Sequence, residues 1–188
     1  MTILIVGLVV FLGIHTLTTL RTIREGFVDG MGEGPYKGVY SLISAVGLGL
    51  IVWGFAQYRN AGYIVVWDPP LGLRPVTLAL NWFAFVALAA AYSPLGKVKA
   101  TLRHPMLVGV KAWALAHLLA NGDLGSIVLF GGLLAWAVYD RNSLKRRRDL
   151  GAPRSGVTAG DAIALAIGSA AFAAMFWLHP IAFGVPIL

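Results

Sequence analysis

Two histidines lie inside apolar stretches of this sequence, and their chemistry is that of cofactor ligands. His15 stands in the apolar run from Thr2 to Leu20, and His117 stands in the run from Pro105 to Ala120. A neutral imidazole is a common ligand of haem iron, and helical bundles often hold cofactors between facing helices. The alternative is that each histidine only forms a hydrogen bond to a neighbouring helix.

Other polar residues near His117 divide into two groups. At 100° per residue, Lys111 lies about 20° from His104 around a helix, whereas His117 lies about 140° from His104. We therefore expect two sites, with Trp113 on the face of His117. Lys111 or Arg21 would pair with an anion such as a cofactor propionate. Alternatively, the Lys111 side chain only extends its amine to the membrane surface.

The composition indicates an integral membrane protein. Of the 188 residues, 58% are hydrophobic and 12% are charged, and the mean hydropathy is +0.77. This is too apolar for a water-soluble core. We expect an all-α fold, a single transmembrane domain over residues 1–188 that forms a bundle of about six transmembrane helices. The absence of cysteine excludes disulfides, thiolate nucleophiles and cysteine-ligated metals.

Polar connections separate six apolar stretches that we expect to cross the membrane. Within the second stretch, Gly47, Gly49 and Gly54 should permit close helix packing. The segment from Glu25 to Pro35 is expected to be a loop, and Asn121 or Gly122 is expected to end a helix in the left-handed conformation before Asp123 caps the next one. The predicted spans are Thr2–Leu20, Val39–Ala56, Val76–Tyr92, Pro105–Ala120, Ile127–Tyr139 and Asp161–Leu178.

The Lys and Arg residues predict the orientation. Along the chain the five connections hold 3, 2, 3, 0 and 6 of them, so the odd connections carry 12 of the 14. The positive-inside rule places the odd connections in the cytoplasm and both termini on the outer side. The net charge of +7 thus reflects topology, and we expect membrane lipids as partners and no nucleic acid.

Familiar hydrolytic chemistry is not indicated. The sequence shows no Ser-His-Asp grouping, no glycine-rich phosphate loop after a strand, and no paired carboxylates in the apolar stretches. The remaining histidine, His179, lies at the outer end of the last stretch beside Pro180 and is expected to contact water.

Several motifs resemble the NnrU family. They are Ala90–Lys99 (AAYSPLGKVK), Arg103–Lys111 (RHPMLVGVK) and Trp113–Gly122 (WALAHLLANG), and the similarity extends to Phe11–Arg21, Trp67–Pro70 and Phe130–Arg148. The resemblance covers nearly the whole chain. It implies a bacterial inner-membrane protein linked to nitrite and nitric oxide metabolism in denitrifying bacteria.

NnrU proteins are also similar to the plant zeta-carotene isomerases, which are haem b membrane enzymes with histidine axial ligands. Carried over to this chain, the ligands fall on His15 and His117. The plant enzymes have a cysteine where this chain has Ala114, so ligand switching to a thiolate is not available here.

A weaker resemblance concerns Arg103, His104 and Pro105, followed by Gly109. It is similar to the Arg-His-Pro motif of isoprenylcysteine-type membrane methyltransferases, which helps to bind S-adenosylmethionine. The acidic pair of those enzymes is absent, because the segment from Asp140 to Arg148 is basic here.

The leading hypothesis is therefore a haem b membrane protein with iron ligands His15 and His117. It would be a redox sensor, or a haem-dependent isomerase of an apolar, lipid-like or isoprenoid substrate that enters from the bilayer. The second hypothesis is a non-enzymatic membrane factor that supports nitrite or nitric oxide reductase, and the third is the methyltransferase.

Overall fold

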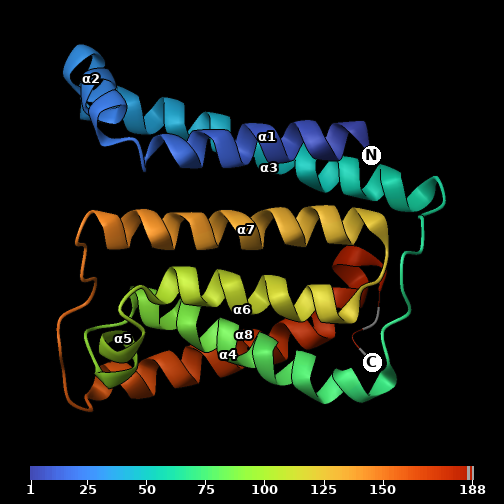
Figure 1. The fold of residues 1–188 in the computed structure, drawn as a ribbon. Helices are drawn as coiled ribbons and strands as arrows, with labels where there is room; N and C mark the ends of the chain where they lie inside the picture. The colour runs from blue at the N-terminus through green and yellow to red at the C-terminus, as the bar shows by residue number, and fades with distance from the viewer. Residues whose placement is uncertain (186, 188) are drawn as a thin grey trace. The chain divides into compact units, whose positions relative to one another are not determined.

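The computed structural model describes residues 1–185 and 187, and this part of the chain is helical without a β-strand (Figure 1). The helices, including the short 3₁₀ helix η1, are α1 (Thr2–Leu17), α2 (Arg21–Met31), α3 (Glu33–Asn60), η1 (Leu71–Leu73), α4 (Arg74–Tyr92), α5 (Lys97–Leu102), α6 (Pro105–Ala120), α7 (Leu124–Arg146) and α8 (Ala159–Phe183). The all-α prediction is confirmed.

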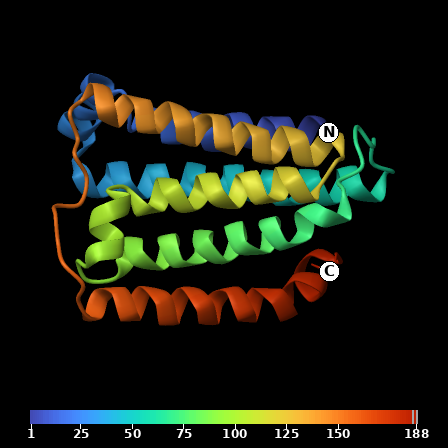
Figure 2. The ribbon, with the colours of Figure 1, turned by 60° about the horizontal axis from the view of Figure 1, so that its bottom comes forward.

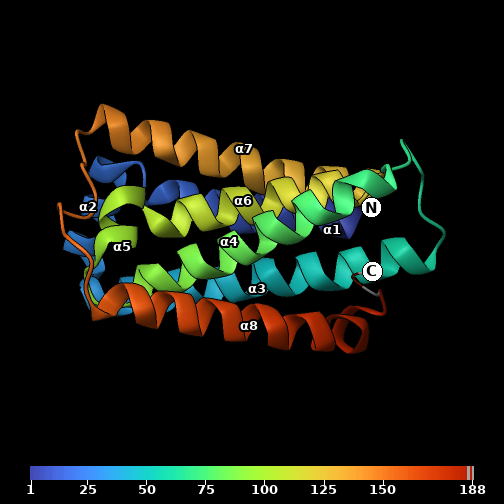
Figure 3. The same ribbon diagram turned by 90° about the horizontal axis from the view of Figure 1, so that it is seen from below.

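The chain divides into two compact units. Residues Met1–Asp68 and Gly122–Leu144 form the first, which contains α1, α2, α3 and most of α7. Residues Pro69–Asn121 and Lys145–Leu188 form the second, which contains α4, α5, α6 and α8. Within the second unit α4 lies alongside both α6 and α8, as Figures 2 and 3 show.

Among the described residues, four helices are long and apolar enough to cross a membrane: α3, α7, α8 and α4 together with η1. The pair α1 and α2 would add a fifth span, but it is bent by 84°. The fourth predicted span, Pro105–Ala120, is α6 and has only 16 residues, or about 24 Å at 1.5 Å per residue, against a hydrocarbon core of about 30 Å. Length and composition therefore support four or five spans and do not confirm six.

Threonine side chains explain the break after α1. The hydroxyl of Thr18 donates to the carbonyl of His15, and that of Thr19 donates to the carbonyl of Thr16, at 2.7 Å in each case. These local bonds compete with the helical ladder for the last carbonyls. The first helix thus ends at Leu17 rather than Leu20.

The prediction of a loop from Glu25 to Pro35 is wrong, because α2 and the start of α3 occupy this segment. Ile23, Phe27 and Met31 recur at four-residue spacing, and all three side chains are exposed. Such a stripe on a polar helix is typical of a helix that lies in a membrane interface. Only Gly32, at φ 87°, interrupts the helical run.

Two connections of the first unit lie side by side. The amide N–H of Val66 donates to the carbonyl of Gly122 at 2.8 Å, and that of Leu124 donates to the carbonyl of Ile64 at 2.9 Å. Asp123 caps α7 as predicted, because its Oδ1 accepts the N–H of Ser126 at 2.9 Å. The left-handed ending of α6 is not found, since Asn121 is extended at φ −128° and ψ 123°.

Glycines allow α1 and α3 to pack with their backbones in contact. A Cβ atom on Gly47 would lie 2.8 Å from the backbone nitrogen of Phe11, and one on Gly54 would collide with the backbone of Leu4. The predicted packing role is confirmed for Gly47 and Gly54. It is wrong for Gly49, where a Cβ would meet open space.

We therefore expect Gly47→Ala to destabilise the protein by about 1–3 kcal/mol, because the α1 backbone cannot step aside for the added methyl. The matched change Gly49→Ala should be neutral or slightly stabilising, since alanine favours helix and meets nothing there. Free energies of unfolding measured in detergent would compare the two. Equal values would contradict the packing.

Candidate functional site

In the first unit, aromatic side chains from three helices surround His15. The ring centroid of His15 lies 4.2 Å from that of Phe11 on α1, 5.4 Å from that of Tyr40 on α3 and 5.6 Å from that of Trp136 on α7. The half-buried imidazole thus lies in an aromatic cage, defined here by Phe11, Tyr40 and Trp136.

A hydrogen bond within α1 fixes the tautomer of His15. Its Nδ1 lies 2.6 Å from the carbonyl oxygen of Phe11, one helical turn earlier. A carbonyl only accepts hydrogen bonds, so Nδ1 carries the proton and the lone pair of the neutral ring lies on Nε2. His15 therefore has the tautomer that binds a metal through Nε2.

Polar contacts hold α7 beside this part of α1. The indole N–H of Trp136 donates to the hydroxyl of Thr16 at 3.1 Å, and the hydroxyls of Thr19 and Tyr139 also lie 3.1 Å apart. Arg21, the other predicted site residue of this unit, is exposed at the first position of α2.

In the second unit, His117 repeats the arrangement of His15. Its Nδ1 lies 2.8 Å from the carbonyl oxygen of Trp113, so the same reasoning places the lone pair on Nε2. The rings of Trp113 and His117 lie 4.8 Å apart, which confirms their shared face. Lys111 is half-buried on α6.

Arg103 and His104 hold a connecting loop at the start of α6. The Arg103 guanidinium donates to the carbonyl of Ala152 at 2.9 Å, and the Ala152 N–H donates back to the Arg103 carbonyl at 2.8 Å. Nε2 of His104 donates to the carbonyl of Asp149 at 3.3 Å. A Cβ on Gly151, at φ 68°, would collide with the Arg103 carbonyl. The Arg-His-Pro motif thus has a structural task here.

Asp161 joins the starts of two helices. Its carboxylate accepts the N–H groups of Lys97 at 3.0 Å and Val98 at 2.7 Å, at the start of α5. It also accepts the N–H of Thr158 at 2.8 Å in the capping box of α8. Gly96 leaves room for the carboxylate, because a Cβ there would lie 2.6 Å from Oδ1.

Lys99, on α5, satisfies backbone carbonyls at the end of α4. Its ammonium donates to the carbonyls of Ala91 and Ser93, at 2.9 Å each. A cation at this position complements the negative end of the α4 dipole.

Sequence reasoning missed Tyr40, Trp136, Asp161 and the loop that Arg103 holds. Phe11 could have been found, because it precedes His15 by one helical turn. The capping role of Asp161 could also have been found, because Thr158 and Asp161 have the spacing of a capping box before an apolar run. Tyr40, Trp136 and the loop bonded to Arg103 come from distant parts of the chain, and no spacing signals them.

The family model described as "NnrU protein" matches residues 3–187, nearly the whole chain. Neither a curated protein nor a solved structure gives a significant match.

We expect Asp161→Asn to destabilise the second unit by about 2 kcal/mol, because an amide has one acceptor oxygen and presents its NH₂ to backbone donors. Asp29→Asn, on the exposed surface of α2, is the matched control and should have little effect. Unfolding in detergent would measure both variants. Hydrogen exchange of the Lys97 and Val98 amides should also accelerate, and unchanged exchange would refute the capping role.

Proposed function

The chain belongs to the NnrU family, and from this premise we propose that it is a membrane protein in which His15 and His117 would hold the iron of one haem b. The observation that carries the proposal is the shared hydrogen bond from Nδ1 to the carbonyl four residues earlier. In metalloproteins a second-shell bond of this kind fixes the ring and directs Nε2 to the metal.

The surroundings of His15 suit a porphyrin. Phe11, Tyr40 and Trp136 supply flat apolar surfaces around the imidazole. In the described part of the chain no three His, Cys, Asp or Glu side chains form a cluster able to hold a bare metal ion. Haem iron needs no such cluster, because the porphyrin supplies four nitrogen ligands and the protein adds one or two.

In this proposal each residue has a defined task. His15 and His117 bind the iron, and Lys111 or Arg21 pairs with a propionate. Trp113 packs against the His117 ring, and His104 keeps its role in the loop. The bound haem would supply redox chemistry, which suits a redox sensor in nitrite and nitric oxide metabolism or a haem-dependent isomerase of an apolar, isoprenoid-like substrate.

A second function follows if the same hydrogen bonds make the two histidines structural residues rather than ligands. Because the Nδ1 of each histidine is satisfied by its own helix, the two rings would also be stable as structural residues. The protein would then be a non-enzymatic membrane factor that supports nitrite or nitric oxide reductase. Unchanged reductase levels and activities after deletion of the gene would rule this out.

Absorption spectra test the haem proposal. Protein purified after haem-replete expression should show a Soret band, and His15→Ala and His117→Ala should each shift or abolish it. His15→Gly should regain the parental spectrum with added imidazole, which replaces the missing ligand, and His179→Gln should keep the band. A missing band, or one that both alanine variants leave unchanged, would reject the proposal.

We also propose that the protein lies in the bacterial inner membrane with six crossings and both termini in the periplasm. The second and fourth connections bond to each other, through Val66 and Gly122. The third and fifth connections do the same, through Arg103 and Ala152. Connections on one side of a membrane would group in this way. Despite its short length, α6 would then cross from the side of the basic third and fifth connections to the side of the second and fourth connections.

Alkaline phosphatase fusions test this topology, because the reporter is active only outside the cytoplasm. A fusion after Gly122 should be active and one after Arg148 inactive. Equal activity at the two positions would contradict the topology, since α7 must separate them.

A further inference from the structure

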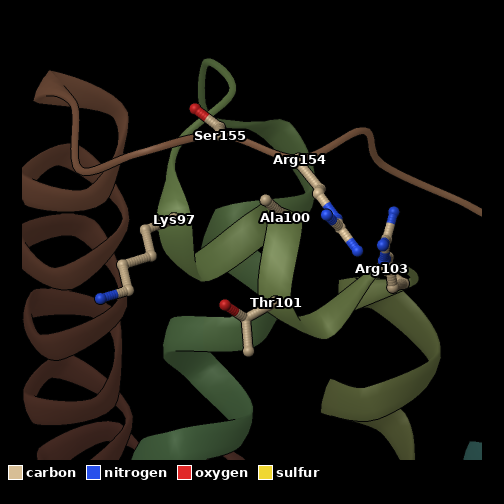
Figure 4. A pocket seen from close by; sticks show the side chains of 6 residues that line it. All are labelled: Lys97, Ala100, Thr101, Arg103, Arg154 and Ser155. Carbon is tan, nitrogen blue, oxygen red and sulfur yellow. The ribbon is translucent and has the colours of Figure 1, made fainter.

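Two arginine side chains meet in a pocket at one end of the second unit. Arg103 follows α5, Arg154 lies in the connection before α8, and Figure 4 shows their guanidinium groups side by side. The pocket has a volume of about 350 Å³, and Lys97, Ala100, Thr101 and Ser155 complete its lining. Three of its six lining residues are therefore cationic.

No carboxylate of the described residues forms an ion pair with Arg103 or Arg154. The two nearest candidates along the chain are otherwise engaged. Asp161 accepts backbone N–H groups from both helices that it caps, and Asp149 accepts the N–H of Gly151 and lies 3.9 Å from His104. Two adjacent like charges repel each other, and an anion placed between them would reverse that cost.

The arginines are placed for such an anion. The bond from the Arg103 guanidinium to the Ala152 carbonyl holds one fork in position before any ligand arrives. The planar fork of arginine matches the oxygens of phosphate with two parallel hydrogen bonds. Lys97 points away from the two guanidinium groups in Figure 4, so it contributes positive charge rather than a direct contact.

We propose that Arg103 and Arg154 bind a phosphate group, with Thr101 beside them. The proposal does not depend on the haem. The pocket lies where the apolar helices α6 and α8 begin, which is the depth of lipid headgroups if these helices cross a bilayer. An anionic phospholipid is thus the favoured source of the phosphate, and free phosphate is the other source of the same chemistry.

The test uses the full chain purified in detergent. Native mass spectrometry would give the dissociation constant of phosphatidylglycerol, with diacylglycerol as the probe that lacks phosphate, and calorimetry would give that of inorganic phosphate. Arg154→Gln removes one fork from an exposed loop residue. Arg146→Gln removes the same charge from an exposed residue in the last turn of α7, outside the pocket.

We expect Arg154→Gln to weaken phosphatidylglycerol binding about tenfold, the cost of about one charge-assisted hydrogen bond, and Arg146→Gln to change it little. Arg154→Lys should lie between, since lysine keeps the charge and loses the fork. If inorganic phosphate alone shows this dependence on Arg154, the site binds free phosphate. Equal losses in the two glutamine variants, or a dependence of diacylglycerol binding on Arg154, would overturn the proposal.

Discussion

The carboxylate of Asp161 is the interaction on which the second unit most depends. The N–H groups in the first turn and the C=O groups in the last turn of a helix have no partner within that helix and must find one elsewhere. Asp161 supplies acceptors to the first turns of α5 and α8, and Lys99 supplies donors to the end of α4. The side chains of Asp161 and Lys99 thus fix where α4, α5 and α8 meet. Arg103, after α5, bonds to Ala152 in the connection that precedes α8.

In the first unit, glycine positions the helices around His15. Gly47 brings the α3 backbone against Phe11, the residue whose carbonyl fixes the His15 tautomer. Close approach of α1 and α3 also sets Tyr40 against the imidazole. The packing of α1 against α3 therefore also positions the groups that contact the His15 ring.

Positive charge serves more than one purpose in this protein. The basic connections predict orientation, but their residues differ in what they contact. The ammonium of Lys99 is bound by two helix carbonyls, whereas the guanidinium groups of Arg103 and Arg154 lie side by side in the lining of a pocket. A count of charges treats these residues alike. Their positions separate a structural cation from a pair suited to an anion.

The sequence alone determined the helical class, the apolar stretches, the cap at Asp123 and the shared face of Trp113 and His117. These features follow from composition and from contacts within one or two helical turns. The tertiary structure decided the rest. Tyr40 and Trp136 reach His15 from α3 and α7, and Asp161 reaches Lys97 from 64 residues away. Helical periodicity says which face a residue occupies, but only the packed chain says what that face meets.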